Sequence, residues 1–80
     1  MIRSNLDLLR VQKERRESRK LPYRVIAEET GLSQGVLVRL MGQTFDKVEK
    51  GTLGTLCAYF GCGIGDILEY VPEESREAGE

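Results

Sequence analysis

The chain has 80 residues, enough for one domain, and a domain of this size buries only about 60–65% of the surface that its unfolded chain exposes. Hydrophobic residues make up 40% and charged residues 31%, with nine Gly and two Pro, which is typical of a globular domain rather than of a disordered or collagen-like chain. Histidine, the commonest general base and metal ligand, is absent, so we expect no enzyme, no metal and no other cofactor.

The net charge of −1 hides an uneven distribution of charge along the chain. Residues 1–50 hold eleven Lys and Arg against seven Asp and Glu, a net charge of +4, whereas residues 51–80 hold one Arg against six acids, a net charge of −5. Only the face that meets a polyanion has to be positive. The basic half therefore keeps nucleic acid among the candidate partners, although it equally fits a solvated helix surface.

Cysteine usage and hydropathy point to a reduced, non-membrane protein. Cys57 and Cys62 lie five residues apart, which fits neither the C-x-x-C spacing of a zinc site nor a small disulfide scaffold, so we expect two partly buried thiols. No stretch approaches the ~20 apolar residues of a membrane span, and the start lacks a signal peptide, so we expect a cytoplasmic protein. Residues 73–80 are acidic and predicted to be a disordered tail.

The first two helices are predicted from apolar periodicity and from residues that start or stop helices. The first begins near Ser4 or Asn5 and runs to the basic stretch 16–20, which is either the end of an extended helix or a loop that touches phosphates. The second begins at Leu21-Pro22, where proline suits the first turn, and ends at Gly31, which readily takes the left-handed conformation.

Three further helices follow. The third covers residues 33–41 and begins at once, because Ser33 is among the best N-caps. The fourth carries apolar residues at the i, i+3, i+4, i+7 spacing of a core-facing helix, namely Leu53, Leu56, Cys57 and Phe60. A short fifth helix uses Ile64, Ile67 and Leu68. Whether residues 1–3 pair with residues 69–71 as short strands stays open, because isolated two-stranded pairings are marginal.

The tract that joins the second and third helices has a mechanical reason at each key position. Ala27 is small where two steeply crossed helices approach most closely, and Gly31 permits the positive φ of a tight turn. Ser33 caps the next helix, while Leu37 and Leu40 hold that helix on the core so that its other side projects outward.

This tract, small-x-x-x-Gly-apolar-Ser from Ala27 to Ser33, resembles the helix-turn-helix of the Xre/Cro-type phage and bacterial repressors. The similarity continues through Thr52-Leu53, Leu56-Cys57 and residues 65–72, and it covers roughly residues 5–72. It implies an all-α, five-helix lambda-repressor-like DNA-binding domain over residues 1–72, with double-stranded DNA as partner.

The resemblance also implies the contact residues, because in that family the third helix lies in the major groove and the second contacts the phosphate backbone. The implied base contacts are Gln34, Gly35, Val36, Val38 and Arg39. The implied phosphate contacts are Ser33, Tyr23, Arg24, Arg19 and Lys20. Gln34 suits adenine, and Arg39 suits guanine or a phosphate. Tyr23 stands where relatives often carry glutamine, and Gly35 either allows close backbone approach or marks a weak base contact.

We expect a transcriptional repressor or autoregulator that acts as a homodimer with no small-molecule ligand. Two base-contacting side chains supply about 2–6 kcal/mol of discrimination, near the bottom of the roughly 4–10 kcal/mol that separates specific from non-specific sites. The region around Ile64, Ile67, Tyr70 and Val71 is either the dimer interface or simple core. The alternative function is an antitoxin-like protein-interaction module on the same fold, which the acidic pI and Gly35 favour.

Overall fold

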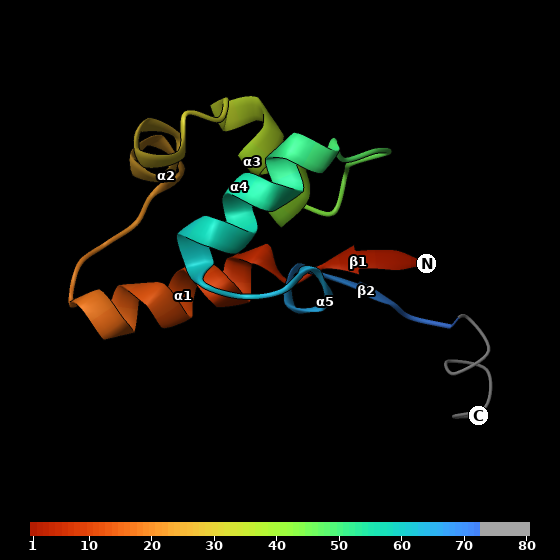
Figure 1. Ribbon diagram of the computed structural model, residues 1–80, viewed down its shortest axis with the longest axis horizontal. Coiled ribbons are helices and arrows are strands. Elements are labelled where there is room, and N and C mark those ends of the chain that lie inside the picture. The colour runs from red at the N-terminus through yellow and green to blue at the C-terminus, as the bar shows by residue number, and fades with distance from the viewer. Residues whose placement is uncertain (73–80) are drawn as a thin grey trace.

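The computed structural model describes residues 1–72, which form a mostly helical domain with one pair of short strands (Figure 1). The elements in chain order are β1 (Ile2–Ser4), α1 (Leu6–Glu17), α2 (Tyr23–Thr30), α3 (Gln34–Met41), α4 (Lys50–Phe60), α5 (Ile64–Ile67) and β2 (Leu68–Tyr70). The predicted five-helix fold is confirmed. The tail predicted for residues 73–80 lies outside the described residues.

The ends of the first two helices refine the sequence prediction. α1 continues to Glu17 and ends at Ser18, whose φ of 55° is left-handed, so the first part of the basic stretch is helical rather than a loop. Pro22 is the N-cap of α2, with an extended ψ of 165°, and not a residue of its first turn as predicted. Its carbonyl still accepts the first hydrogen bonds of α2, from the N–H groups of Val25 and Ile26.

The two strands pair antiparallel, with Ile2 opposite Tyr70 and Ser4 opposite Leu68. Met1 and Val71 extend the pairing by exchanging two hydrogen bonds of 2.7 Å each. The strand pair that the sequence left open is therefore present. The prediction that Leu68 belongs to the fifth helix is wrong, because α5 stops at Ile67 and Leu68 begins β2.

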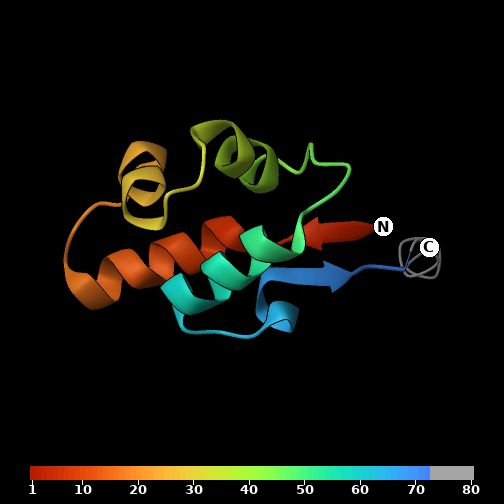
Figure 2. The same cartoon turned by 45° about the horizontal axis from the view of Figure 1, so that its top comes forward.

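A single apolar core holds the elements together. Within residues 1–72 its buried members come from all five helices and from the segment between α1 and α2: Leu6, Leu21, Ile26, Leu37, Leu40, Leu56, Phe60 and Ile67. Figure 2 shows α2 and α3 above α1, which runs along α4 beneath them. Among the described residues, no other helix or strand lies above α3 in this view, so its upper surface is left uncovered.

Candidate nucleic-acid interface

The corner between α2 and α3 is built by local hydrogen bonds. Gly31 has φ 79°, and its N–H donates to the carbonyl of Ala27 at 2.8 Å, which ends α2. The Thr30 hydroxyl donates to the Ile26 carbonyl at 2.7 Å and accepts from the Leu32 N–H at 3.2 Å. Sequence reasoning missed Thr30, although a threonine just before a helix-ending glycine is a recognisable signal for such a turn.

Ser33 starts α3 as predicted. Its backbone is extended, and its hydroxyl accepts a hydrogen bond from the Val36 N–H at 3.2 Å. This bond satisfies one of the donors that the first turn of a helix leaves without a partner. The remaining N–H groups of that turn, together with the helix dipole, favour an anion such as a phosphate near the start of α3.

The burial of α3 separates its two faces. Leu37 and Leu40 are 0% and 2% exposed and pack in the core. Four of the five residues expected to contact bases are exposed, namely Gln34, Gly35, Val38 and Arg39. The fifth, Val36, is half-buried and packs partly against the core. The structure therefore brings four of these residues together on one outward surface and turns Val36 toward its edge.

A cleft of about 330 Å³ lies between α3 and the segment that leads to α4. The apolar lining includes Val36, Phe45 and Val48. The charged lining consists of two cations and two carboxylates: Arg39, Lys47, Asp46 and Glu49. Sequence reasoning did not single out Lys47. The signal that would have found it is a lysine in the loop that directly follows the outward-facing helix.

Ion pairing divides the basic residues into two groups. Arg3, Arg10, Lys13 and Arg19 are held by carboxylates. Within residues 1–72 the structure records no ion pair for the others, which are Arg15, Arg16, Lys20, Arg24, Arg39, Lys47 and Lys50. Cations without a carboxylate partner are available to neutralise phosphate, so the expected contacts Lys20 and Arg24 keep that capacity.

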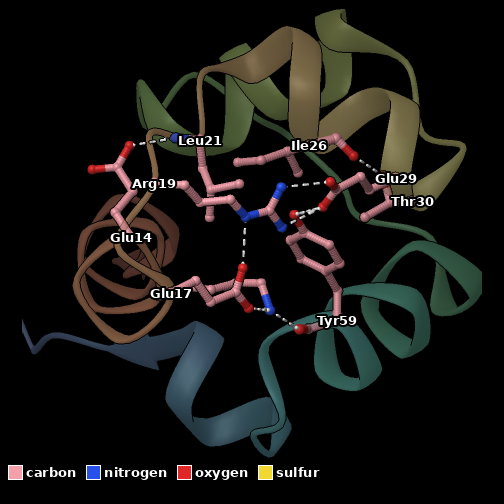
Figure 3. Close-up of polar contacts among 9 residues, drawn as sticks. Glu14, Glu17, Arg19, Leu21, Ile26, Glu29, Thr30 and Tyr59 are labelled. Carbon is pink, nitrogen blue, oxygen red and sulfur yellow. Dashed lines mark hydrogen bonds and ion pairs between the residues drawn. The ribbon is translucent and has the colours of Figure 1, made fainter.

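Arg19, one of the expected phosphate contacts, is bound to carboxylates of the protein itself (Figure 3). Its guanidinium makes two hydrogen bonds to the Glu29 carboxylate, at 2.7 and 2.9 Å, and one to Glu17 at 2.7 Å. The Tyr59 hydroxyl donates to the same Glu29 carboxylate at 2.6 Å. The side chains therefore connect the segment after α1 with α1, α2 and α4, and Arg19 acts first as a structural tie.

These contacts change the acidity of the groups involved. The hydrogen bonds from Arg19 and then from Tyr59 lower the pKa of Glu29 from 4.5 to about 2. Burial, and then the hydrogen bond to Glu29, raise the pKa of Tyr59 to about 12. The Lys13 ammonium lies 4.6 Å from the centre of the Tyr59 ring and donates to the Tyr59 carbonyl at 3.2 Å.

Tyr23 and Arg24, the first two residues of α2, are both exposed, with Tyr23 37% exposed. No side chain caps the start of this helix. The Leu21 N–H just before it donates to the Glu14 carboxylate at 2.7 Å, which fastens the buried Leu21 to α1. The tyrosine hydroxyl and the guanidinium are thus presented at the same helix end.

The two cysteines of the chain are Cys57 and Cys62, and both lie within the described residues. Cys57 and Cys62 are half-buried free thiols, and burial, followed by the neighbouring Cys57, raises the pKa of Cys62. A raised pKa lowers the thiolate fraction, which is the reactive form. In the described part of the chain, no cluster of His, Cys, Asp or Glu is suited to hold a metal ion, and no helix is long and apolar enough to span a membrane.

The comparison with protein families agrees with this geometry. The model of the Cro/C1-type HTH DNA-binding domain matches residues 8–73. The chain belongs to this family. Searches of curated proteins and of solved structures found no match. As a member of this family of DNA-binding domains, the protein is a DNA-binding regulator, and its partner is DNA.

Proposed function

We propose that this Cro/C1-type protein is a sequence-specific transcriptional repressor or autoregulator that inserts α3 into the major groove as a homodimer. The observation that carries the proposal is the separation of faces on α3, where Leu37 and Leu40 are buried while Val38 is 46% exposed and Gln34 and Arg39 are exposed. A helix held by one face and free on the other fits the groove-binding geometry of this family.

The proposed base contacts divide by chemistry. Gln34 and Arg39 supply hydrogen bonds to adenine and guanine edges. Val38 offers apolar contact to a thymine methyl, and Gly35 allows the helix backbone to approach the bases. Val36 is the weakest member of the set, because its half-buried side chain packs against the core and reaches the groove only at its edge.

The proposed phosphate contacts are Ser33, Tyr23, Arg24 and Lys20, with Arg19 in a secondary role. Arg19 is 40% exposed but bound to two carboxylates, so a phosphate has to compete with Glu17 and Glu29 for it. We add Lys47, which lines the same cleft as Arg39 and has no recorded carboxylate partner in residues 1–72. Lys47 thereby supplies the neutralisation that Arg19 is less free to give.

The proposed dimer forms at the outer edge of β2. Ile2, Ile64 and Tyr70 are 53%, 58% and 65% exposed, whereas Ile67 is fully buried and belongs to the core. Met1 and Val71 exchange hydrogen bonds, so the alternating pattern of an antiparallel pair turns the Tyr70 N–H and carbonyl away from β1. An exposed strand edge beside apolar side chains suits pairing with a second copy.

The dimer is tested by Tyr70→Lys, which places a charge on this edge. We expect the parent to sediment as a dimer and Tyr70→Lys as a folded monomer that binds the selected DNA much more weakly. A monomeric parent, or a Tyr70→Lys variant that stays dimeric, would remove this interface from the proposal.

DNA selection followed by a salt series tests the main proposal. A duplex is selected from a random pool, and its affinity is measured between about 50 and 200 mM salt. Several phosphate contacts predict a fall of orders of magnitude over this range. Arg39→Ala should weaken binding by about 1–3 kcal/mol, roughly 5- to 150-fold, and relax the preference at one base position.

Arg3→Ala is the matched control, because it removes the same charge from β1, where Arg3 pairs with Glu69. We expect it to leave the base preference unchanged. If Arg39→Ala behaves as Arg3→Ala does, the assignment of the groove-binding face is wrong.

The second candidate function is an antitoxin-like protein-interaction module. It is favoured by the apolar lining of the cleft beside α3 and by the absence of a polar side chain at Gly35 and Val36. No sequence enrichment in the selection, together with binding that ignores salt, would support this alternative over the regulator.

A further inference from the structure

The C-terminal end of α3 is closed by a pair of hydrogen bonds around a left-handed residue. The Thr44 N–H donates to the Arg39 carbonyl at 2.9 Å, and the Gln43 N–H donates to the Leu40 carbonyl at 3.4 Å. In this arrangement the left-handed residue is usually glycine. Here Gly42 has φ −89°, and Gln43 takes the left-handed conformation with φ 64°.

The Gln43 side chain accounts for this choice of residue. Its Oε1 accepts from the Ser4 N–H at 2.8 Å, and its Nε2 donates to the Ser4 carbonyl at 2.7 Å. We call this pair of bonds the Gln43–Ser4 bridge. Bonded and non-bonded residue pairs alternate along an antiparallel ladder. Because Met1 and Val71 form a bonded pair, Ser4 and Leu68 form a non-bonded one, and the Ser4 N–H and carbonyl point away from β2. The amide therefore takes the place that a third strand would occupy beside Ser4.

The bridge connects α3 with the best-buried part of β1. Ser4 is 4% exposed, and its hydroxyl accepts from the Leu6 N–H at 3.1 Å, at the start of α1. Burial of Leu37 and Leu40 holds α3 against the core, but apolar packing has no preferred direction. Two short hydrogen bonds to a planar amide, in contrast, have a preferred direction. The bridge thus limits rotation of α3 about its own axis.

We propose that Gln43 is a positioning residue for DNA recognition: through the Gln43–Ser4 bridge it fixes the direction in which Val38 and Arg39 meet the groove. This inference rests on the proposed function of α3. Gln43 itself need not touch DNA. Its effect passes through the Thr44–Arg39 hydrogen bond, which closes the helix one residue beyond it.

The test uses Gln43→Asn and Gln43→Gly. Asparagine keeps an amide and tolerates the left-handed conformation, but it is too short by one methylene to reach Ser4, and glycine adopts this conformation without strain. We expect both variants to stay folded, with melting temperatures below the parent's because the buried Ser4 N–H and carbonyl lose their hydrogen-bond partner. Gln12→Asn is the matched control, because Gln12 is an exposed residue of α1 whose side chain makes no recorded hydrogen bond to the described residues.

The decisive measurement is the ratio of affinities for the selected duplex and for a scrambled duplex of equal length. We expect about a tenfold fall in this ratio for both Gln43 variants, with an unchanged salt slope, because the phosphate contacts stay in number while the base contacts lose alignment. An unchanged ratio, or a parallel fall of both affinities with stability, would overturn the proposal.

Amide hydrogen exchange separates this proposal from the proposed function. In the parent, the Ser4 amide should exchange far more slowly than the Ile2 amide, which also points away from β2, and Gln43→Asn should remove that protection. Equal exchange at Ser4 and Ile2 in the parent would overturn the bridge. A parent that protects Ser4 but prefers no DNA sequence would instead refute the function of α3, and the positioning role with it.

Discussion

Replacing Gly35 by alanine separates the contribution of this residue to the stability of α3 from its contribution to DNA binding. Gly35 lies in the first turn of this helix and is exposed. A Cβ built there would lie 3.5 Å from the Arg39 Nη1 atom and 4.0 Å from the Ser33 Oγ atom. Both separations are ordinary van der Waals contacts, so the fold has room for the methyl group. The Arg39 guanidinium nevertheless lies directly beside it.

The expected gain in stability follows from helix propensity alone. Glycine in a helix interior costs about 0.8–1.0 kcal/mol relative to alanine, and Gly35 is in the first turn, so Gly35→Ala should raise the free energy of unfolding by no more than about that amount. For a domain of this size the melting temperature should rise by roughly 4–8 °C per kcal/mol. Gly54→Ala in α4 is the matched control, because its Cβ would meet no atom within 4 Å and it should give a similar gain.

DNA binding should respond in the opposite direction. A methyl group between the helix backbone and the bases, in contact with Arg39, should weaken binding of the selected duplex by about tenfold, equal to about 1.4 kcal/mol. Gly54→Ala should bind as the parent does. Thermal unfolding and a duplex titration measure the two effects. A lower melting temperature for Gly35→Ala would refute the helix argument, and unchanged affinity would refute the close approach of Gly35 to DNA.

Three further predictions concern the scaffold. Leu37→Ala should lower the free energy of unfolding by about 2–5 kcal/mol, because Leu37 is fully buried, and a loss below 1 kcal/mol in chemical unfolding would contradict its core role. Ala27→Leu should destabilise the fold by about 1–3 kcal/mol through overpacking where α2 meets the core, and a variant as stable as the parent would argue against close packing there. Because the pKa of Glu29 is lowered from 4.5 to about 2, its ionised carboxylate stabilises the fold above pH 4.5, and this contribution should disappear as the pH falls toward 2. Melting curves of Glu29→Gln should lack this part of the acid dependence, and identical curves for variant and parent would show that the Arg19 contacts do not persist in solution.

Residues close together in the chain made the helix-turn-helix predictable. Gly31 ends α2 and Ser33 begins α3 through hydrogen bonds that span three or four residues, so each residue acts on its immediate neighbours in the chain. The spacing of Leu37 and Leu40 likewise assigned the inward face of α3. The outward face followed by elimination, and only Val36, at the boundary between the two faces, lies differently from the expectation.

The tertiary structure alone decided the contacts between distant segments. The β1–β2 pair joins residues more than 60 positions apart. The sequence predicts Arg19 as a phosphate contact, whereas the fold places it in an ion pair with Glu29. The Gln43–Ser4 bridge has no sequence signal, because any exposed glutamine has the same chemistry. Helix ends and turns are fixed by neighbours in the chain, whereas these contacts form only after the core has offset the entropy of closing long loops, so their partners depend on packing rather than on local pattern.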